Sequence, residues 1–578
     1  RWRPVEMGPR IFETDLQTYR AMAGLRGTWG SWDWESAFSH SRAEAIDTSY
    51  NRISKTLLAA EMAKDTPDAI NPFAGPYGNT QEQMDRVRID VSNETATKLS
   101  TWDFRASRND LFSLPAGFVG AAWGVEWRRE SYLEDRDDRL DGTVQFGDGE
   151  GSARSDVVGV SPTDDSSGSR HVWSAYGEIL APLISPDMGI PLVHSFDLQI
   201  AGRAEAFSDI DEQVFKPKIA ASWRPVPQLT LRGAWSKGFR APNLQQLNRG
   251  DISRMTQGQN DFYREDVTGD PDDTGETYRR SVREANPNLK PEDTETVVFG
   301  AELNIPVGAV DFRTGIDLWH FKQKNVIDNF GVEAALALDY LLINEGSSNP
   351  NVIRESVTAE DQAAFDAWNA ENPNDQRVAV GKVRYVIDPY VNLDDRDVKG
   401  WDAFFIMNWD AGDFGTFRLN AELTHLTKWS QERDALAGLC DPGGAFEGND
   451  DVCVDIDPDR LQKDGKPKWR ASGSLNWRLK KFGAGLSFKH IGAFDDLSAD
   501  LTDDNGNTVY WRVDDYTVFN AFIDYRFKNV VADSVRLRFG VNNLTNEAPP
   551  LADESRGYYS SYHSNQGRTF YVDLTAKF

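Results

Sequence analysis

The chain has 578 residues, a formal net charge of -28 at pH 7 and a mean hydropathy of -0.55. Its length exceeds that of one ordinary soluble domain, and its excess of acidic residues argues against a nucleic-acid partner. No apolar run is long enough for a transmembrane helix, but a membrane β-barrel stays open as an interpretation, because its strands expose apolar side chains only at alternate positions.

Amphipathic strands with short turns alternate with long polar segments along the chain. Period-two patterns predict about seventeen strands, at residues 17–27, 31–43, 101–110, 118–132, 170–183, 194–207, 214–223, 229–239, 294–304, 310–326, 383–408, 416–429, 469–479, 483–491, 513–527, 535–544 and 567–578. Long polar segments cover residues 47–98, 135–169, 243–290 and 327–382, and a short helix is expected at 359–369.

The alternation of long and short connections favours a membrane barrel, which has short periplasmic turns and long extracellular loops. A soluble β-sandwich is the alternative, but it has no reason to place all its long loops on one side. An odd strand count means either that one strand was missed or that the chain lacks its beginning. The opening residues RWRPVEMGPR, without an initiating Met or a signal sequence, favour the second interpretation.

The last strand alternates between apolar and polar side chains up to the C-terminus. Its apolar face contains Phe570, Val572, Leu574, Ala576 and Phe578. A strand of this length can cross the apolar band of an outer-membrane barrel. An amphipathic last strand that ends on an aromatic residue looks like the assembly signal of such barrels, and a closing strand of a soluble β-protein is the alternative.

Two cysteines, Cys440 and Cys453, lie in a segment rich in Gly, Asp and Pro. Their close spacing in one loop predicts a disulfide, and with it an oxidising compartment. Closing such a loop contributes about 3 kcal/mol by the chain-entropy model. Two free thiols are the alternative.

Three stretches resemble signatures of TonB-dependent outer-membrane receptors. The first, LTLRGAWSKGFRAPNL at 229–244, contains Gly238, Phe239, Arg240, Ala241, Pro242 and Asn243. The second is NPNLKPE at 286–292, and the third is VRLRFGVNNLTN at 535–546; a weaker match covers 392–402. The resemblance runs from about residue 199 to the terminal Phe578. We expect the GFRAPN residues to shape the barrel rather than to contact a ligand.

The resemblance implies an all-β fold, a transmembrane antiparallel β-barrel of the 22-stranded type in the bacterial outer membrane. Family members have a plug domain ahead of the barrel, so residues 1–578 would be a partial barrel domain that lacks the plug and the first strands. The implied function is TonB-dependent uptake of a scarce solute such as a siderophore, cobalamin or an oligosaccharide. The implied partners are the TonB complex, reached through the missing N-terminal part, the receptor's own plug, the barrel assembly machinery, membrane lipid and lipopolysaccharide, and the small-molecule or oligosaccharide ligand.

Strand alternation also predicts which side chains face a wet lumen. Leu231, Gly233 and Trp235 suit lipid, so Arg232 points inside. The polar side chains expected to contact a plug are Asp197, Gln199, Arg203, Glu205, Arg536, Arg538 and Asn542. The segments 243–290 and 327–382 are expected to capture ligand outside. Trp368 and Trp429 could stack on sugars, with membrane-girdle tryptophans as the equal alternative.

No residue pattern predicts an enzyme, a cofactor or a metal site, since neither HExxH nor a Gly-rich phosphate loop is present. The acidic runs are interpreted as solvated loops rather than calcium sites; they comprise Asp455, Asp457 and Asp459, and Asp270, Asp272, Asp273 and Glu276. The ligand-binding residues stay unknown at this stage. Two other functions remain open, a non-transporting scaffold or adhesion barrel and an outer-membrane lipase or protease.

Overall fold

One large antiparallel sheet organises the computed structural model, which describes residues 3–143, 155–393, 395–431, 458–502, 508–528 and 533–577. Within these residues seventeen strands each pair with the next. They are β1 (Ile11–Trp29), β2 (Trp32–Ile53), β3 (Arg88–Leu114), β4 (Gly117–Asp135), β5 (Ser166–Ile184), β6 (Ser195–Phe207), β7 (Val214–Val226), β8 (Leu229–Arg240), β11 (Glu292–Val307), β12 (Val310–Lys324), β17 (Arg396–Asp410), β18 (Thr416–Gln431), β19 (Trp469–Leu479), β20 (Phe482–Ile491), β23 (Tyr516–Lys528), β24 (Ser534–Asn542) and β25 (Thr569–Lys577).

The seventeen strands correspond one to one with those expected from the sequence, so their number and order are confirmed. Several boundaries are wrong. Residues 47–53 and 88–98, expected as loop, extend β2 and β3, because their polar residues still alternate along paired strands. The expected strand 383–408 is three strands, and the one expected at 513–527 begins at Tyr516.

The sheet has two edges in the described part of the chain. There β1 pairs only with β2 and β25 pairs only with β24, so no described register closes the sheet into a ring. The side chains of β1 are exposed at almost every position, as expected of a strand with one free edge and no cover on either face. Barrel closure and the total of twenty-two strands therefore stay predictions.

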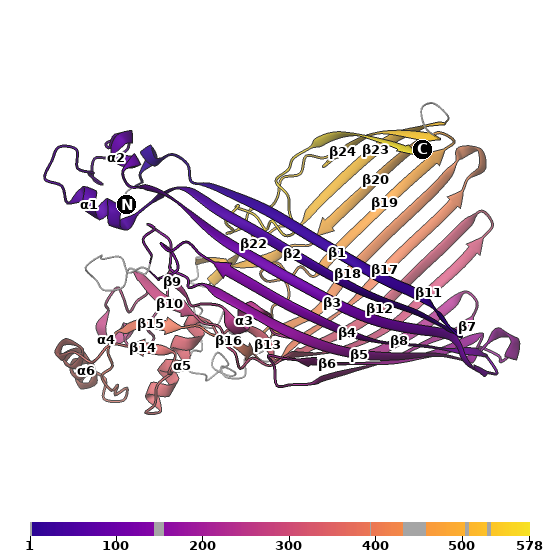
Figure 1. Cartoon of the computed structure of the whole chain (residues 1–578), viewed down its shortest axis with the longest axis horizontal. Helices are drawn as coiled ribbons and strands as arrows, with labels where there is room; N and C mark the ends of the chain where they lie inside the picture. Colours follow the sequence, from indigo (N-terminus) through magenta and orange to yellow (C-terminus); the bar gives the residue numbers. More distant parts are fainter. Residues whose placement is uncertain are drawn as a thin grey trace.

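Long and short connections gather at opposite ends of the sheet. Figure 1 shows tight turns at one end, where the C-terminus lies, and the helices and small sheets of the long loops at the other. The expected separation of short turns from long loops is thus confirmed.

The loop end contains its own secondary structure. Its helices are α1 (Lys55–Met62), α2 (Gln81–Asp85), α3 (Leu244–Asn248), α4 (Glu265–Thr268), α5 (Val332–Asn344) and α6 (Ala359–Glu371), with a short 3-10 turn at Val5–Met7. Two further 3-10 turns, at Pro186–Met188 and Gly412–Phe414, belong to the short turns that follow β5 and β17. The strands of the loop end are β9 (Ile252–Gln257), β10 (Tyr278–Arg283), β13 (Val326–Asn329), β14 (Val352–Arg354), β15 (Val383–Ile387), β16 (Tyr390–Leu393), β21 (Phe494–Thr502) and β22 (Thr508–Val513). The helix expected at 359–369 is confirmed by α6, which Thr358 and Asp361 begin with a capping box.

Buried apolar clusters lie among the loops rather than along the sheet. The largest contains Phe262, Val332 and Leu336 together with Val386. On the sheet itself large apolar side chains such as Phe299 and Leu318 are exposed on one face. This distribution is typical of a sheet whose apolar face meets lipid. Among the described residues, no helix is both long and apolar enough to cross a bilayer.

Candidate functional site

The two faces of the sheet differ in chemistry. On β8, β11 and β12, Arg232 and Asp317 flank Gly300 on one face, and the Arg232 guanidinium donates to the Asp317 carboxylate at 2.9 and 2.5 Å. A Cβ at residue 300 would clash with both side chains, so only glycine leaves room for this pair. The opposite face presents Phe299 and Leu318. We call the apolar face outward and the polar face inward, as in a membrane barrel; Arg232 is inward, as expected.

A second inward network joins side chains of β4 and β6. Arg128 donates to Glu130 at 2.7 Å and to Glu126 at 3.3 Å, and lies 3.4 Å from Glu205. Arg203 donates to Glu205 at 2.5 Å. The expected lumen-facing residues Arg203 and Glu205 thus join one cross-strand network, whose charges are largely neutralised by one another.

Gln199 and Arg536, two of the other expected inward residues, also meet polar partners. Gln199 donates to Glu178 at 2.6 Å, and Arg536 donates to Asp573 at 3.3 Å. Asp197 lies on the same face of β6 as Gln199, and Asn542 lies on the same face of β24 as Arg536. The structure therefore places this residue set on the inward face.

Near the short-turn end the inward face forms a hollow of about 540 Å³. Arg478 donates to both oxygens of the buried Asp524 carboxylate, at 2.7 and 3.1 Å, and Arg538 lies 3.5 Å from it. The Arg538 guanidinium stacks on Phe522, 3.7 Å from the ring centroid. Within the described residues, Nε of Arg538 has no hydrogen-bond partner. The hollow is thus lined by cations, two of which, Arg478 and Arg538, neighbouring side chains hold in place.

The GFRAPN residues contact β5, β6, β11 and α3 at the loop end of β8. Phe239 packs edge-on against Phe207, 6.0 Å between ring centroids, and the Pro242 carbonyl accepts a hydrogen bond from buried Arg170 at 2.6 Å. Asn243 caps α3 reciprocally with Gln246. A Cβ at residue 238 would meet Thr294 Oγ1 at 2.6 Å, so glycine permits close strand approach. Ala241 lies between Arg240 and Pro242 in the same stretch. These contacts agree with a role in barrel geometry.

Glu292, from NPNLKPE, connects the end of β8 to β11 and to the second loop. Its side chain is fully buried, and it accepts bonds from the Arg240 guanidinium, from Gln323 Nε2 and from the Ile327 backbone N–H. Two sequence signatures therefore meet in one ion pair. The resemblance identified both stretches, but nothing in the sequence predicted that Arg240 and Glu292 pair.

Two long loops fold together into one unit, which we call the loop unit and define as residues 243–291 and 325–395 without residue 394. In it β10 of the first loop pairs in parallel with β15 of the second, and β9 and β14 extend the small sheet. Phe262 of the first loop packs in the same core as α5 of the second. The loops therefore share secondary structure as well as a core.

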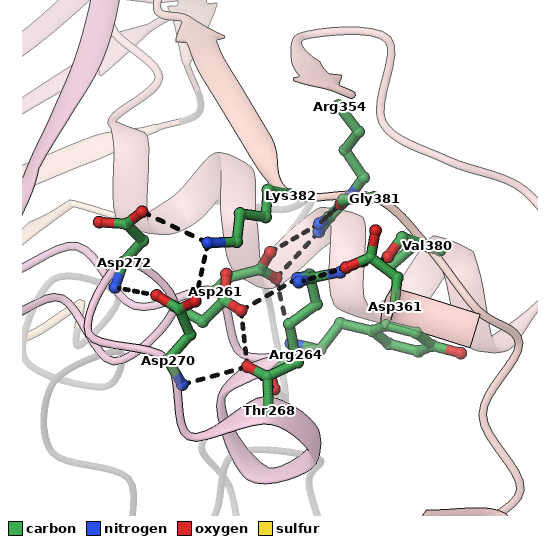
Figure 2. Close-up of polar contacts among 12 residues, drawn as sticks. Asp261, Arg264, Thr268, Asp270, Asp272, Arg354, Asp361, Val380, Gly381 and Lys382 are labelled. Carbon is green, nitrogen blue, oxygen red and sulfur yellow. Dashed lines mark hydrogen bonds and ion pairs between the residues drawn. The ribbon is translucent and has the colours of Figure 1, made fainter. Parts of the chain in front are cut away.

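Ion pairs between the two loops hold the loop unit together (Figure 2). Arg354 of the second loop donates to Asp261 of the first at 2.6 and 2.9 Å, and also to Asp339. Arg264 of the first loop pairs with Asp361 of the second at 2.9 Å. Burial alone would lower the pKa of Arg354, but Asp261 and Asp339 outweigh it and raise that pKa. Each loop thus supplies a cation that neutralises the buried carboxylates of the other.

The acidic run of the first loop is neutralised within the same unit. Lys382 donates to Asp270 at 2.7 Å and lies 3.5 Å from Asp272, while buried Asp273 pairs with Arg264 at 3.1 Å. The Lys382 ammonium, aided by the backbone N–H of Asp272, lowers the pKa of Asp270. In the described part of the chain no group of three His, Cys, Asp or Glu side chains could hold a metal ion. Asp270, Asp272 and Asp273 are thus close to cations of the loop unit.

The tryptophans expected near a ligand already hold cations of the chain. Arg377 lies 4.9 Å from the ring centroid of Trp368, and Trp429 has Arg396 at 5.2 Å and Lys466 at 4.8 Å. At least one face of each ring is therefore occupied. A sugar could stack on an occupied face only if the cation moved away from it.

The last strand has the expected two faces. Phe570, Val572 and Leu574 are exposed on the outward face, with Ala576 in the same alternation. Phe578, Cys440 and Cys453 lie outside the described residues, as do Asp455 and Asp457. Their expected roles stay predictions.

Comparison with known proteins covers almost the whole chain. A family model described as "TonB dependent receptor-like, beta-barrel" matches residues 4–544. No curated protein matches the chain in sequence.

Several solved structures share the fold. The siderophore receptor PirA from Acinetobacter baumannii has 15% sequence identity and a TM-score of 0.57, over 97% of this chain and 63% of that one. A mutant of the ferric enterobactin receptor PfeA from Pseudomonas aeruginosa has 14% identity and a TM-score of 0.55, over 97% and 62%. The outer membrane transporter YddB from Escherichia coli has 8% identity and a TM-score of 0.56, over 98% and 63%. The chain thus spans less than two thirds of each of these relatives.

Proposed function

The chain belongs to the TonB-dependent receptor-like β-barrel family, a family of the bacterial outer membrane, and we propose that it forms the barrel of a receptor that imports a scarce solute with energy supplied through TonB. The observation that carries this proposal is the combination of an outward apolar face with an inward wall of ion-paired side chains. Such a wall suits a wet lumen, and the loop unit stands at the end of the sheet where solute would arrive.

We further propose that the complete receptor contains a plug and additional strands. Unpaired backbone groups at the edges of β1 and β25 would each cost several kcal/mol in lipid, so other strands are needed to satisfy them. The inward cations, including Arg478 and Arg538, are suited to hydrogen-bond a polar plug within the lumen. A barrel of about twenty-two strands is wide enough to need one.

The outer membrane holds no ATP, so work that displaces a plug has to arrive from the inner membrane, by family analogy through TonB.

The barrel assembly machinery is the partner we propose for the last strand. Heat-modifiable, membrane-inserted protein should disappear when Phe578 is deleted, and unchanged insertion would exclude that role.

Among substrate classes, a ferric siderophore is the first to test, because solved structures of this fold include a siderophore receptor and a ferric enterobactin receptor. Cobalamin and oligosaccharides are the other candidates. Native mass spectrometry of the purified complete receptor, with one representative of each class, is the direct experiment. We expect one class to bind and to bind more weakly when the loop unit is perturbed by Asp261→Asn. Binding of none would favour a scaffold or adhesion barrel.

A further inference from the structure

Four neighbouring strands, β19, β20, β23 and β24 (Figure 1), carry an inward face that is rich in cations. We call the inward side chains of these strands the cationic strip. The alternation that places Arg478 and Asp524 inward gives its charged members, namely Arg470, Arg478, Lys489, Asp524, Arg526, Arg536 and Arg538. Asp524 is the one carboxylate among the described inward side chains of these strands, and it is buried beside Arg478 and Arg538. In a chain of net charge -28, such an excess of cations is an exception.

The middle of the cationic strip is recessed. Most of its residues there are small or uncharged and polar, namely Ser472, Ser474, Asn476, Gly485, Ser487 and Asn520. Two hollows of about 540 Å³ each border the strip and share Arg418 of β18. The hollow nearer the loop end is lined by the three serines and also by Glu422 of β18. Since Arg470 and Arg478 lie roughly 26 Å apart along β19, the recess separates two groups of cations.

The cations at both ends of the strip lack full compensation. At the loop end Arg470 and Lys489 are exposed, and neither has a hydrogen bond or an ion pair within the described residues. At the turn end Arg526 and Arg536 are paired in register, although like charges directly opposite one another destabilise a sheet. Asp573 of β25 accepts from Arg536 at 3.3 Å, but Arg526 has no ion pair in the described part of the chain. A negative charge in the recess would relieve this repulsion.

We propose that the cationic strip is one wall of a water-filled passage that selects anions and conducts a small anionic solute past the plug. A cleft lined by charges of one sign concentrates ions of the opposite sign. The serine and asparagine side chains of the recess can hydrogen-bond a hydrated solute, and their small size leaves room for it. The inference rests on the proposed function, because it assumes a plugged receptor. It adds the charge of the solute and the sector of the wall that the solute follows.

The other sector of the sheet provides a matched control. The register of the sheet places Arg20 of β1 and Lys218 of β7 inward as well. Both side chains are exposed, and neither has a hydrogen bond or an ion pair within the described residues. Their neighbouring strands also carry inward carboxylates, such as Asp47 on β2 and Glu205 on β6. Removing these two cations therefore takes the same charge from the inward face without altering the cationic strip.

The test replaces Ser487, in the middle of the strip, by Cys in the complete receptor in intact cells. Two methanethiosulfonate reagents of similar size, one with a sulfonate and one with a trimethylammonium group, react with residue 487, and each rate is divided by that of free cysteine. Peptide mass mapping reads residue 487 separately from Cys440 and Cys453. A unit charge about 6 Å away changes a local ion concentration about threefold in water, so two cations with salt screening should give the anionic reagent an advantage of about tenfold.

The loop-end cations should account for this advantage. Arg470→Gln/Lys489→Gln should bring the two reagents to nearly equal rates, whereas Arg470→Lys/Lys489→Arg, which keeps both charges, should keep the advantage. The control Arg20→Gln/Lys218→Gln should keep it as well. The loop end is altered because the cations of the turn end are also suited to contact the plug. Folding of each variant is checked by heat-modifiable migration. If the double variant does not fold, Lys489→Gln alone should reduce the advantage about threefold.

Four results would overturn the proposal. Reaction of residue 487 only after denaturation would show that the plug fills the recess. Equal rates of the two reagents in Ser487→Cys, or an equal loss of the advantage in both Gln double variants, would show that the strip does not select anions. TonB-dependent uptake of cyanocobalamin or maltohexaose, which carry no net charge, would assign a neutral solute. In contrast, an anion advantage without TonB-dependent uptake of these solutes or of ferric enterobactin would contradict the proposed function and leave the anion-selecting passage supported.

Discussion

Arg240, at the end of β8, donates both arms of its guanidinium to the buried carboxylate of Glu292, at the start of β11, although the two residues are 52 positions apart in the sequence. Glu292 also accepts from Gln323 and from the Ile327 backbone, so it joins β8, β11 and the second loop. The ion pair therefore fixes the place where the sheet ends and the loop unit begins.

Replacing Arg240 by Ala should destabilise the protein because it leaves the Glu292 carboxylate buried without its cation. Breaking a fully buried pair costs roughly 3–5 kcal/mol; since Arg240 is half-exposed, we expect about 2–3 kcal/mol. The measurement is the temperature at which heat-modifiable migration is lost. The matched control is Arg313→Ala, which breaks the exposed cross-strand pair with Glu302 and should leave that temperature unchanged. Equal shifts in the two variants would contradict a special role for Glu292.

The loop unit should respond as one body to a change in either loop. Asp261→Asn, in the first loop, removes a buried carboxylate from Arg354 of the second. We expect amide exchange in α5 and α6 to rise by about thirtyfold, equivalent to about 2 kcal/mol, although the substitution lies outside that loop. Lys382→Gln is the control, because its ion pair with Asp270 also joins the loops but is partly exposed. Exchange that rises only within residues 243–291 would show that the loops open separately.

The last loop, between β24 and β25, should loosen at acidic pH. His563 is buried against Tyr516 and Phe494, and neither ring nitrogen has a hydrogen-bond partner among the described residues. Burial, reinforced by the charge of Lys489, lowers the pKa of His563 below its ordinary value of 6.5. The neutral ring is thus favoured in the folded state, so this contribution to stability is complete above pH 6.5 and is lost as the pH falls below it.

Amide exchange of residues 543–568 tests this pH dependence. Protection should fall between pH 7.5 and pH 5.5 in the unmodified protein and stay nearly constant in His563→Phe, which keeps an aromatic ring without a titratable group. His194→Gln, at a short turn, should leave the pH dependence intact. A pH-independent loop in the unmodified protein, or an unchanged profile in His563→Phe, would refute the assignment to His563.

Cys440 and Cys453 should form a disulfide on the extracellular side. Their close spacing in one polar loop of an outer-membrane protein supports pairing. Peptide mapping under non-reducing conditions should recover the two cysteines in one linked peptide. Recovery of two alkylated thiols from protein kept oxidised throughout purification would contradict the bond.

Strand order was predictable because each strand carries its own signal. The outward positions of β8, for example, read Leu231, Gly233 and Trp235, and this alternation is visible without knowledge of the neighbouring strands. The parity of Arg232 followed from the cost of placing a charge in lipid. Register was not predictable, since it is set by neighbours such as Phe299 and Asp317 that lie far along the chain.

The loop unit was not predictable for a related reason. Asp261 and Arg354 are polar residues within long polar segments, where a buried ion pair and a solvated charge have the same appearance in sequence. Parallel pairing of β10 with β15 joins segments about one hundred residues apart, and neither has a strong strand pattern. Both segments were expected to capture ligand, which stays a prediction, and their shared core appears only when the chain is folded.

Uptake of the cognate solute by cells that produce the complete receptor, with and without TonB, tests the central claim most directly. We expect high-affinity, saturable uptake that requires TonB and is lost when the inner membrane is de-energised. Under the same conditions, binding of the solute at the cell surface should persist without TonB. Equal high-affinity uptake in cells that lack TonB would contradict the account and indicate a passive pore, while binding without uptake in either strain would indicate a scaffold.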